Sequence, residues 1–167
     1  MCFGYAGHFC GETGWELRVP STQAVQIYDL RMKAGADLEV RNVGLQTLNS
    51  LRLEKAYRDF GIDLDNTDNP MEVRLGFAVR LDKPGGFIGR DASVRIKARR
   101  VPETRLLQFL LNEPQPLLYG NELICPGESE VGYLQVGGHG HTLGGAVGIG
   151  FVTLDRPIST DVVDAGR

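Results

Sequence analysis

The sequence predicts an α+β segment followed by an all-β segment, and three observations support this fold class. Residues 1–101 combine strand-like and helix-like hydrophobic patterns. Residues 102–167 consist of short apolar runs separated by glycine, proline and asparagine. The composition, with 42% hydrophobic and 23% charged residues, is that of a globular protein. We therefore expect an α+β domain over 1–101 and a small antiparallel β-barrel or sandwich over 102–167.

The stretch "GETGWELRVP", which holds the only tryptophan of the chain, predicts a strand after a glycine-bounded turn. From Trp15 to Val19, apolar and charged residues alternate with the period of a half-buried strand. We expect Trp15, Leu17 and Val19 to face the core, which leaves Glu16 and Arg18 on the opposite face. Glu16 then either meets solvent, as most glutamates do, or lines a site.

Two helices are expected to follow this strand. Ser21 or Thr22 can cap the first helix, whose apolar stripe stops at Gly35. The second helix is expected over 44–60 and ends at Gly61. Its residues on one broad apolar face are Leu45, Leu48, Leu53, Ala56, Tyr57 and Phe60.

Two polar residues, Asn49 and Arg52, fall inside this apolar face. A guanidinium among leucines must be paired or must extend its stem toward solvent. We expect Arg52 to reach a carboxylate, with Glu16 and Glu12 as the first candidates. The alternative is that Arg52 and Glu16 line a ligand pocket.

A polar loop, a short buried segment and a third helix are expected between the second helix and the β segment. The loop is "DLDNTDNP", and the buried segment covers residues 75–81. The helix is "FIGRDASVRIKARR", with Asp91 near its start and a basic end, which suits the helix dipole. We expect the basic residues to form a solvated helix end: Arg95, Lys97, Arg99 and Arg100.

Charge and hydropathy disfavour several classes of partner, although a local basic patch could still exist. The net charge of −3 gives no attraction to phosphate backbones or anionic membranes, so we expect neither nucleic acid nor membrane as a partner. No apolar run reaches the roughly 18 residues of a membrane span, and "MCFGYAGHFC" is not a secretory signal. The cysteines lack metal or disulfide spacing and indicate thiols in a reducing compartment: Cys2, Cys10 and Cys125.

Known catalytic motifs are absent from the sequence. The stretch "VGGHGHTLGGAVGIG" matches neither glycine-rich phosphate-loop pattern, so its glycines favour bulges and close packing. His139 and His141 could supply two metal ligands from one strand face, but no further ligand has matching spacing. We therefore expect no metal site, and the residues by themselves identify no catalytic residue.

Several blocks nevertheless resemble the folate-binding aminomethyltransferase family, in matching order over nearly the whole chain. They are "GETGWELRVP", "NSLRLEKAYRDFGIDL" and "NPMEVRLGFAVRLDKPGGFIGRDAS". The tail, "PLLYGNELI" and "EVGYLQVGGHGHTLGGAVGIGFV", resembles the closing β-barrel domain of the same family. The family includes the glycine cleavage T-protein and the C-terminal halves of dimethylglycine and sarcosine dehydrogenases. The block "NSLRLEKAYRDF" is more similar to the dehydrogenase-type members.

The resemblance implies tetrahydrofolate as the ligand and Glu16 as a residue that holds its pterin ring. A carboxylate can accept two parallel N–H bonds from the amino group and ring nitrogen of a pterin. Phe9, Glu12 and Arg52 are then candidates for the pocket wall or its support. Phe9 lies where the family usually has tyrosine, and Leu48 replaces an arginine of stand-alone T-proteins, so their polar contacts are missing.

The resemblance begins midway through the family pattern, so we expect a C-terminal fragment that lacks the catalytic aspartate and is inactive alone. In the complete protein we expect one-carbon transfer from a methylated amine such as dimethylglycine or sarcosine to tetrahydrofolate. Any FAD would belong to a preceding domain. The alternative is a non-catalytic regulatory or scaffold homologue, like the regulatory subunit of pyruvate dehydrogenase phosphatase. The expected location is the cytoplasm, or the mitochondrial matrix in a eukaryote.

Overall fold

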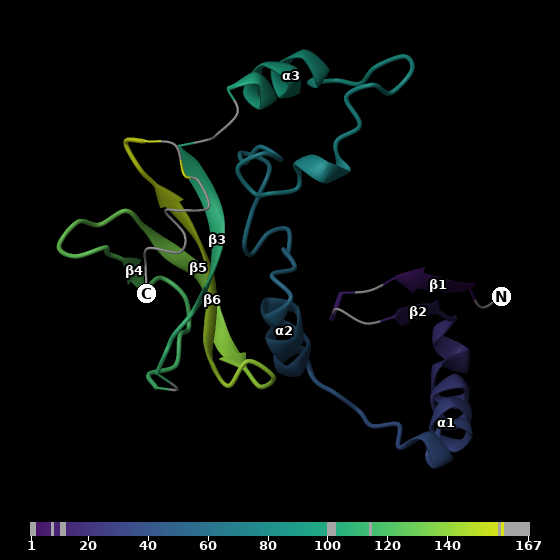
Figure 1. The fold of residues 1–167 in the computed structure, drawn as a ribbon. Coiled ribbons are helices and arrows are strands. Elements are labelled where there is room, and N and C mark those ends of the chain that lie inside the picture. Colours follow the sequence, from purple (N-terminus) through teal and green to yellow (C-terminus); the bar gives the residue numbers. More distant parts are fainter. Residues whose placement is uncertain are drawn as a thin grey trace. The chain divides into compact units, whose positions relative to one another are not determined.

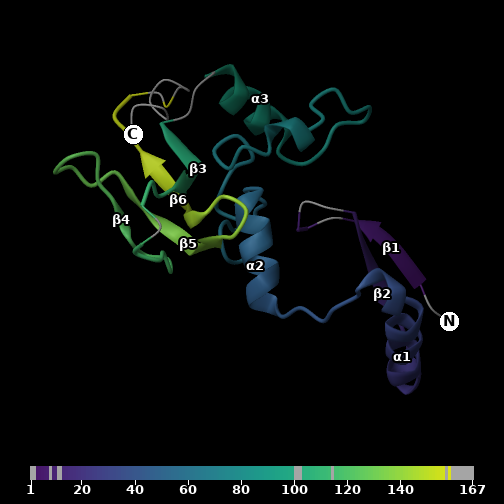
Figure 2. The same ribbon diagram turned by 60° about the horizontal axis from the view of Figure 1, so that its bottom comes forward.

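The computed structural model describes residues 3–7, 9–10, 13–99, 103–113, 115–156 and 158, with the backbone alone for the first range. The chain forms two compact units, residues 1–57 and 58–167, whose elements are shown in Figures 1 and 2. The second unit includes residues on both sides of the predicted domain boundary near residue 101, and that boundary stays a prediction. No helix within the described ranges is long and apolar enough to cross a membrane.

The first unit opens with a two-stranded antiparallel ribbon. β1 (Phe3–Gly7) pairs with β2 (Gly14–Arg18) in a register that places Tyr5 opposite Glu16. The strand predicted from the alternating pattern is thereby confirmed. Glu16 is the central residue of β2.

The predicted core face of β2 is wrong. Trp15 is 70% exposed and Leu17 is 43% exposed, while Val19 just beyond the strand is half-buried. The alternating pattern fixes which side chains share a face, but a second layer must cover that face to bury it. Among the described residues, β2 pairs with β1 alone, and a two-stranded ribbon provides no such layer.

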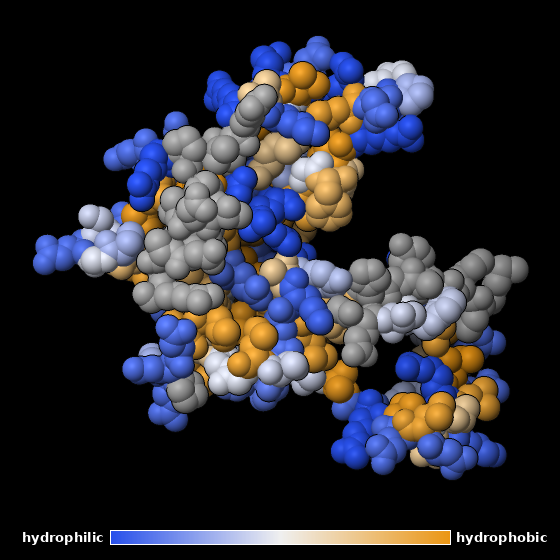
Figure 3. Space-filling model, in the orientation of Figure 1, coloured by the Kyte–Doolittle hydropathy of each residue, from blue (hydrophilic) through white to orange (hydrophobic). Residues whose placement is uncertain are grey.

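The first predicted helix is present as α1 (Ala24–Ala34), and it ends at Gly35 as expected. Neither of the predicted cap residues caps it, because a 3₁₀ turn (Ser21–Gln23) precedes the helix and moves its N-cap to Gln23. Gly35 has a packing reason as well, since a Cβ atom there would lie 2.8 Å from the Cβ of Val40. Much of α1 is exposed, and Figure 3 shows apolar surface in this region.

The second helix, α2 (Leu45–Glu54), ends well before the predicted residue Phe60. Two residues of the predicted apolar face are not core residues: Leu45 is 83% exposed and Phe60, beyond the end of the helix, is 69% exposed. Leu53, near the end of the helix, is buried.

A left-handed residue ends α2. Ala56 has a φ of 53°, its N–H donates to the carbonyl of Leu53, and the N–H of Tyr57 donates to the carbonyl of Arg52. This pair of hydrogen bonds is the Schellman motif that terminates many helices, usually with glycine at the left-handed position. Because the left-handed residue is alanine and not glycine, no helix stop was expected before Gly61.

The segment between α2 and the sheet is mostly loop. The predicted buried segment 75–81 is wrong, because it contains a 3₁₀ turn (Gly76–Ala78) that leaves Phe77 86% exposed. A 3₁₀ turn directs successive side chains outward on different sides, so one apolar run cannot be buried as a whole. The third predicted helix is confirmed as α3 (Arg90–Ala98).

The second unit contains the predicted β segment as one antiparallel sheet. Its strands are β3 (Thr104–Leu110), β4 (Leu123–Ile124), β5 (Gly132–Gly140) and β6 (Gly145–Thr153). Their spatial order is β3-β6-β5-β4, with the long strands β5 and β6 side by side in Figures 1 and 2. Buried apolar residues of this unit include two packed clusters: Leu107, Val152 and Ile158, and Leu118, Leu134 and Ala146.

Candidate functional site

Glu16 presents its carboxylate on the open face of β2. Its Oε1 atom lies 2.9 Å from the Nε of Arg18, two residues along the same strand face. The side chains are 60% and 77% exposed, respectively. An ion pair this exposed contributes at most about 1 kcal/mol, so it restrains the carboxylate only weakly. The carboxylate is available to a ligand.

The chemistry of this carboxylate suits a ligand with adjacent N–H donors. An ionised carboxylate has two oxygens with about four lone-pair sites, and Arg18 uses one of them in the structure. Two parallel N–H groups can bind the same carboxylate in the fork geometry that gives strong, oriented recognition.

Arg52 is buried, as predicted, with an exposed fraction of 1%. Its Nε donates to the Oδ1 of Asn49 at 2.9 Å, and its Nη1 donates to the carbonyl of Tyr57 at 2.9 Å. The two polar residues of the predicted apolar face therefore bind each other. An ion pair of Arg52 with Glu16 or Glu12 stays a prediction.

For the other predicted site residues, Phe9 and Glu12, the described part of the structure shows no contact that assigns a role. Phe9 and its neighbour Cys10 are half-buried, and Glu12 lies outside the described residues. The structure thus brings Glu16 together with Arg18, and Arg52 with Asn49 and Tyr57. The proposed pocket roles of Phe9, Glu12 and Arg52 stay predictions.

His139 and His141, considered above as metal ligands, pack against each other. Their ring centroids lie 5.0 Å apart with an interplanar angle of 70°, an edge-to-face arrangement. In the part of the chain that the structure describes, no group of three or more His, Cys, Asp or Glu side chains could hold a metal ion.

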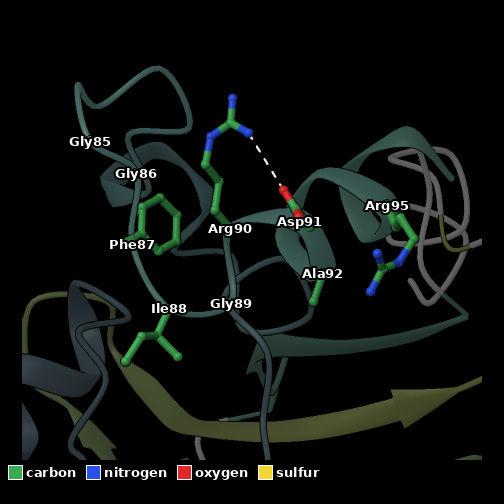
Figure 4. Close-up of a pocket in the computed structure, with 9 residues that line it drawn as sticks. All are labelled: Gly85, Gly86, Phe87, Ile88, Gly89, Arg90, Asp91, Ala92 and Arg95. Carbon is green, nitrogen blue, oxygen red and sulfur yellow. Dashed lines mark ion pairs between the residues drawn. The ribbon is translucent and has the colours of Figure 1, made fainter.

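The glycine-rich loop before α3 frames a hollow of about 670 Å³, shown in Figure 4. Arg90 is held within this loop, because its Nε donates to the carbonyl of Leu81 at 2.8 Å and its Nη1 lies 3.5 Å from Asp91. Ile88 points outward and is fully exposed. The Arg90 contacts tie the loop to the first turn of α3.

Sequence reasoning missed several polar residues of the second unit. Asp63 is 1% exposed, and its Oδ2 accepts the backbone N–H of Asp59 at 2.8 Å. Arg58 and Arg105 are half-buried cations. The local sequence did not indicate that these side chains are buried, because Asp63 begins a polar loop and each arginine adjoins charged or polar residues.

Two family models match the chain. Residues 5–83 match the GCVT N-terminal domain, and residues 104–166 match the glycine cleavage T-protein C-terminal barrel domain. The chain belongs to the glycine cleavage T-protein family. The match to the barrel domain confirms the fold class predicted for the C-terminal segment.

Curated relatives include both oxidative enzymes and aminomethyltransferases. The chain is 37% identical over 153 residues to 4-methylaminobutanoate oxidase (formaldehyde-forming) of Paenarthrobacter nicotinovorans, covering 92% of this chain and 18% of the oxidase. It is 32% identical over 160 residues to human mitochondrial sarcosine dehydrogenase, covering 95% and 17%. It is 32% identical over 148 residues to the aminomethyltransferase of Halothermothrix orenii, covering 89% and 41%.

A solved structure has the same fold. The glycine cleavage system aminomethyltransferase T from Bartonella henselae superposes with a TM-score of 0.77 at 26% sequence identity, covering 91% of this chain and 42% of that chain. The chain therefore spans less than half the length of each of these relatives. The family and fold predicted from the sequence blocks are confirmed.

Proposed function

We propose that the complete protein transfers a one-carbon unit from a methylated amine to tetrahydrofolate, and that this chain supplies part of the folate-binding wall. The names of the relatives support the amine part of the proposal, because sarcosine, dimethylglycine and 4-methylaminobutanoate all carry N-methyl groups. The "GETGWE" block supports the folate part.

The observation that carries the proposal is the exposed carboxylate of Glu16 on β2. It occupies the motif position whose glutamate holds a pterin in the family that the sequence resembles. A pterin offers an amino group and a ring N–H side by side, which matches the two oxygens of one carboxylate. Arg18, on the same face, donates its Nε–H to one oxygen of Glu16 at 2.9 Å and leaves the other oxygen open to a ligand.

The chain's residues would bind and orient rather than carry out the chemical step. Tetrahydrofolate, when bound, supplies the amine nitrogens that accept a carbon at the oxidation level of formaldehyde. Oxidation of the methyl group requires an electron acceptor, which we assign to a flavin domain outside this chain. Orienting a bound reactant can supply a large part of the rate enhancement of a transfer reaction.

An activity assay on the complete natural polypeptide tests this proposal. Sarcosine and dimethylglycine are supplied in turn with an electron acceptor, with and without tetrahydrofolate. We expect 5,10-methylenetetrahydrofolate when tetrahydrofolate is present and free formaldehyde when it is omitted. Formaldehyde release that tetrahydrofolate does not change would contradict the proposal.

The same assay tests the second candidate, a non-catalytic regulatory or scaffold homologue. Leu48 supports that candidate, because it stands where stand-alone T-proteins carry an arginine. A polypeptide that oxidises neither amine and binds no tetrahydrofolate would favour the regulatory function.

A further inference from the structure

Arg18 lies next to Glu16 on one face of β2 and has hydrogen-bond donors to spare. Its Nε donates to the Oε1 of Glu16 at 2.9 Å, and residues two positions apart share a strand face. A guanidinium carries five N–H donors, and this contact uses one of them. Among the residues that the structure describes, the Nη1 and Nη2 atoms of Arg18 have no hydrogen-bond acceptor. They are therefore available to a ligand that reaches Glu16.

The Glu16–Arg18 pair is electrically neutral, and both of its members are accessible. The side chains are 60% and 77% exposed, respectively. A free cation at this pair would be repelled by Arg18, and a free anion would be repelled by Glu16. The pair instead suits an uncharged group that offers an acceptor beside two donors, because it presents donors of Arg18 and then two acceptor oxygens of Glu16.

One edge of a reduced pterin has the complementary order of groups. Its 4-oxo group is an acceptor, the adjacent N3–H is a donor, and the 2-amino group is a second donor. Glu16 can accept from the two donors, because each carboxylate oxygen has lone pairs for more than one hydrogen bond. When the oxygen that already accepts from Arg18 takes the N3–H, the neighbouring 4-oxo group lies on the side of Arg18.

We propose that Arg18 donates an Nη–H to the 4-oxo group of the pterin and thereby selects 4-oxopterins over 4-aminopterins. This inference rests on the proposed function, because it takes tetrahydrofolate as the ligand of Glu16. In a 4-amino analogue an amino group replaces the oxygen acceptor, and N3 loses its hydrogen. Arginine has donors alone, so it cannot make the same hydrogen bond with an amino group. Arg18 is thus a specificity-determining residue beside Glu16.

Calorimetric titration of the complete natural polypeptide tests this selection, with tetrahydrofolate and its 4-amino-4-deoxy analogue as the two probes. We expect Arg18→Met to weaken tetrahydrofolate binding roughly 10-fold, the loss of one hydrogen bond, and to leave the affinity for the 4-amino analogue unchanged or higher. Arg18→Lys, which keeps a charged donor, should recover part of the loss. Arg31→Met, a change of an exposed arginine on α1, should bind both probes like the unmodified polypeptide.

Failure of this inference and failure of the proposed function give different results. If Glu16→Ala weakens tetrahydrofolate binding but Arg18→Met leaves the preference for tetrahydrofolate over the 4-amino analogue unchanged, selection by Arg18 is overturned and Glu16 keeps its role. An equal loss for both probes belongs to this outcome, since it would mean that Arg18 only holds Glu16 in place. If Glu16→Ala has no effect, or the unmodified polypeptide does not bind tetrahydrofolate, the proposed function fails and the inference fails with it.

Discussion

The Nε and Nη1 atoms of Arg52 donate to Asn49 and Tyr57 at the point where α2 ends. A buried guanidinium is stabilising only when its donors are paired, and removal of such a group leaves its acceptors without partners. Arg52 therefore fixes the local backbone through its side chain. The apolar face predicted for α2 has a polar end for this reason.

Replacement of Arg52 with methionine, which keeps the stem and removes the donors, should destabilise the chain. We expect a loss of about 2–3 kcal/mol in the free energy of unfolding, because Asn49 and the carbonyl of Tyr57 lose a charged donor whose side chain is buried. Urea denaturation of the full chain measures it. Arg31→Met on the exposed surface of α1 is the control and should change stability by less than about 0.5 kcal/mol. Equal effects of the two changes would contradict this role.

Glu122 gives the chain a pH-dependent turn. Its Oε1 accepts the N–H of Tyr119 and its Oε2 accepts the N–H of Gly120, both at 2.8 Å. Burial raises the pKa of Glu122, but its hydrogen bonds from backbone N–H groups outweigh burial and lower the pKa overall. A carboxylate whose pKa is lower in the folded state stabilises the fold above its unfolded pKa and loses that contribution as pH falls through the folded pKa.

Glu122→Gln should therefore lower stability at pH 7 by about 1 kcal/mol, and the difference from the unmodified chain should shrink below roughly pH 4. Urea denaturation at pH 7 and at pH 3 gives the comparison. Glu128→Gln, a change at an exposed glutamate, should show little difference at either pH. A difference for Glu122→Gln that is the same at both pH values would be inconsistent with a charged cap.

The C-terminal end of α2 could not be predicted from the hydrophobic pattern. The pattern from residue 44 to 60 stays compatible with a helix, yet the helix ends at Glu54 because Ala56 adopts a left-handed conformation. An alanine in this conformation costs about 1–2 kcal/mol relative to its usual conformations, and surrounding structure must hold it there.

Ala56→Gly should stabilise the chain by about 0.5–1 kcal/mol, because glycine adopts a positive φ without strain. Ala92→Gly, a change on the exposed surface of α3, should have the opposite effect of similar size, since glycine weakens a helix interior. Thermal unfolding of both variants followed by circular dichroism gives the signs. Destabilisation by both changes would show that the α2 terminus needs its alanine.

The backbones of β5 and β6 approach each other closely at Gly150. A Cβ atom on Gly150 would meet the carbonyl oxygen of Tyr133 and would lie 2.8 Å from the Cα of Leu134, both backbone atoms. Gly150→Ala should therefore destabilise the chain by about 1–3 kcal/mol or more, measured by urea denaturation. Gly44→Ala is the matched control, because that position has a negative φ and open space. A neutral Gly150→Ala would mean that the two strands can separate at little cost.

Across the described chain, the helices and strands were easier to predict from the sequence than the burial of their side chains. The strand around Glu16, the helices α1 and α3, and the antiparallel sheet each follow from a local period that the sequence displays. The exposure of Trp15 and Phe77 does not, because burial depends on which layer covers a face.

For the candidate site too, the strand could be predicted from the sequence, whereas the role of its glutamate could not be predicted from the residues alone. Glu16 was singled out from a charged position in an alternating strand, and the structure gives it an exposed carboxylate on β2. The residues alone left it between solvent and a pocket. Its assignment to a pterin rests on the sequence block shared with a family whose models match 5–83 and 104–166.

A calorimetric titration of tetrahydrofolate into the complete natural polypeptide tests the role of Glu16 most directly, with Glu16→Ala and Glu12→Ala as the paired variants. Loss of a charge-assisted pair costs about 1.5–3 kcal/mol, so Glu16→Ala should weaken binding roughly 10- to 150-fold. Glu12→Ala should do much less, and the fold should survive Glu16→Ala because the Glu16 side chain is exposed. The 167-residue chain alone should bind weakly or not at all. Equal affinity in the unmodified polypeptide and Glu16→Ala would contradict the assignment of Glu16 to the pterin.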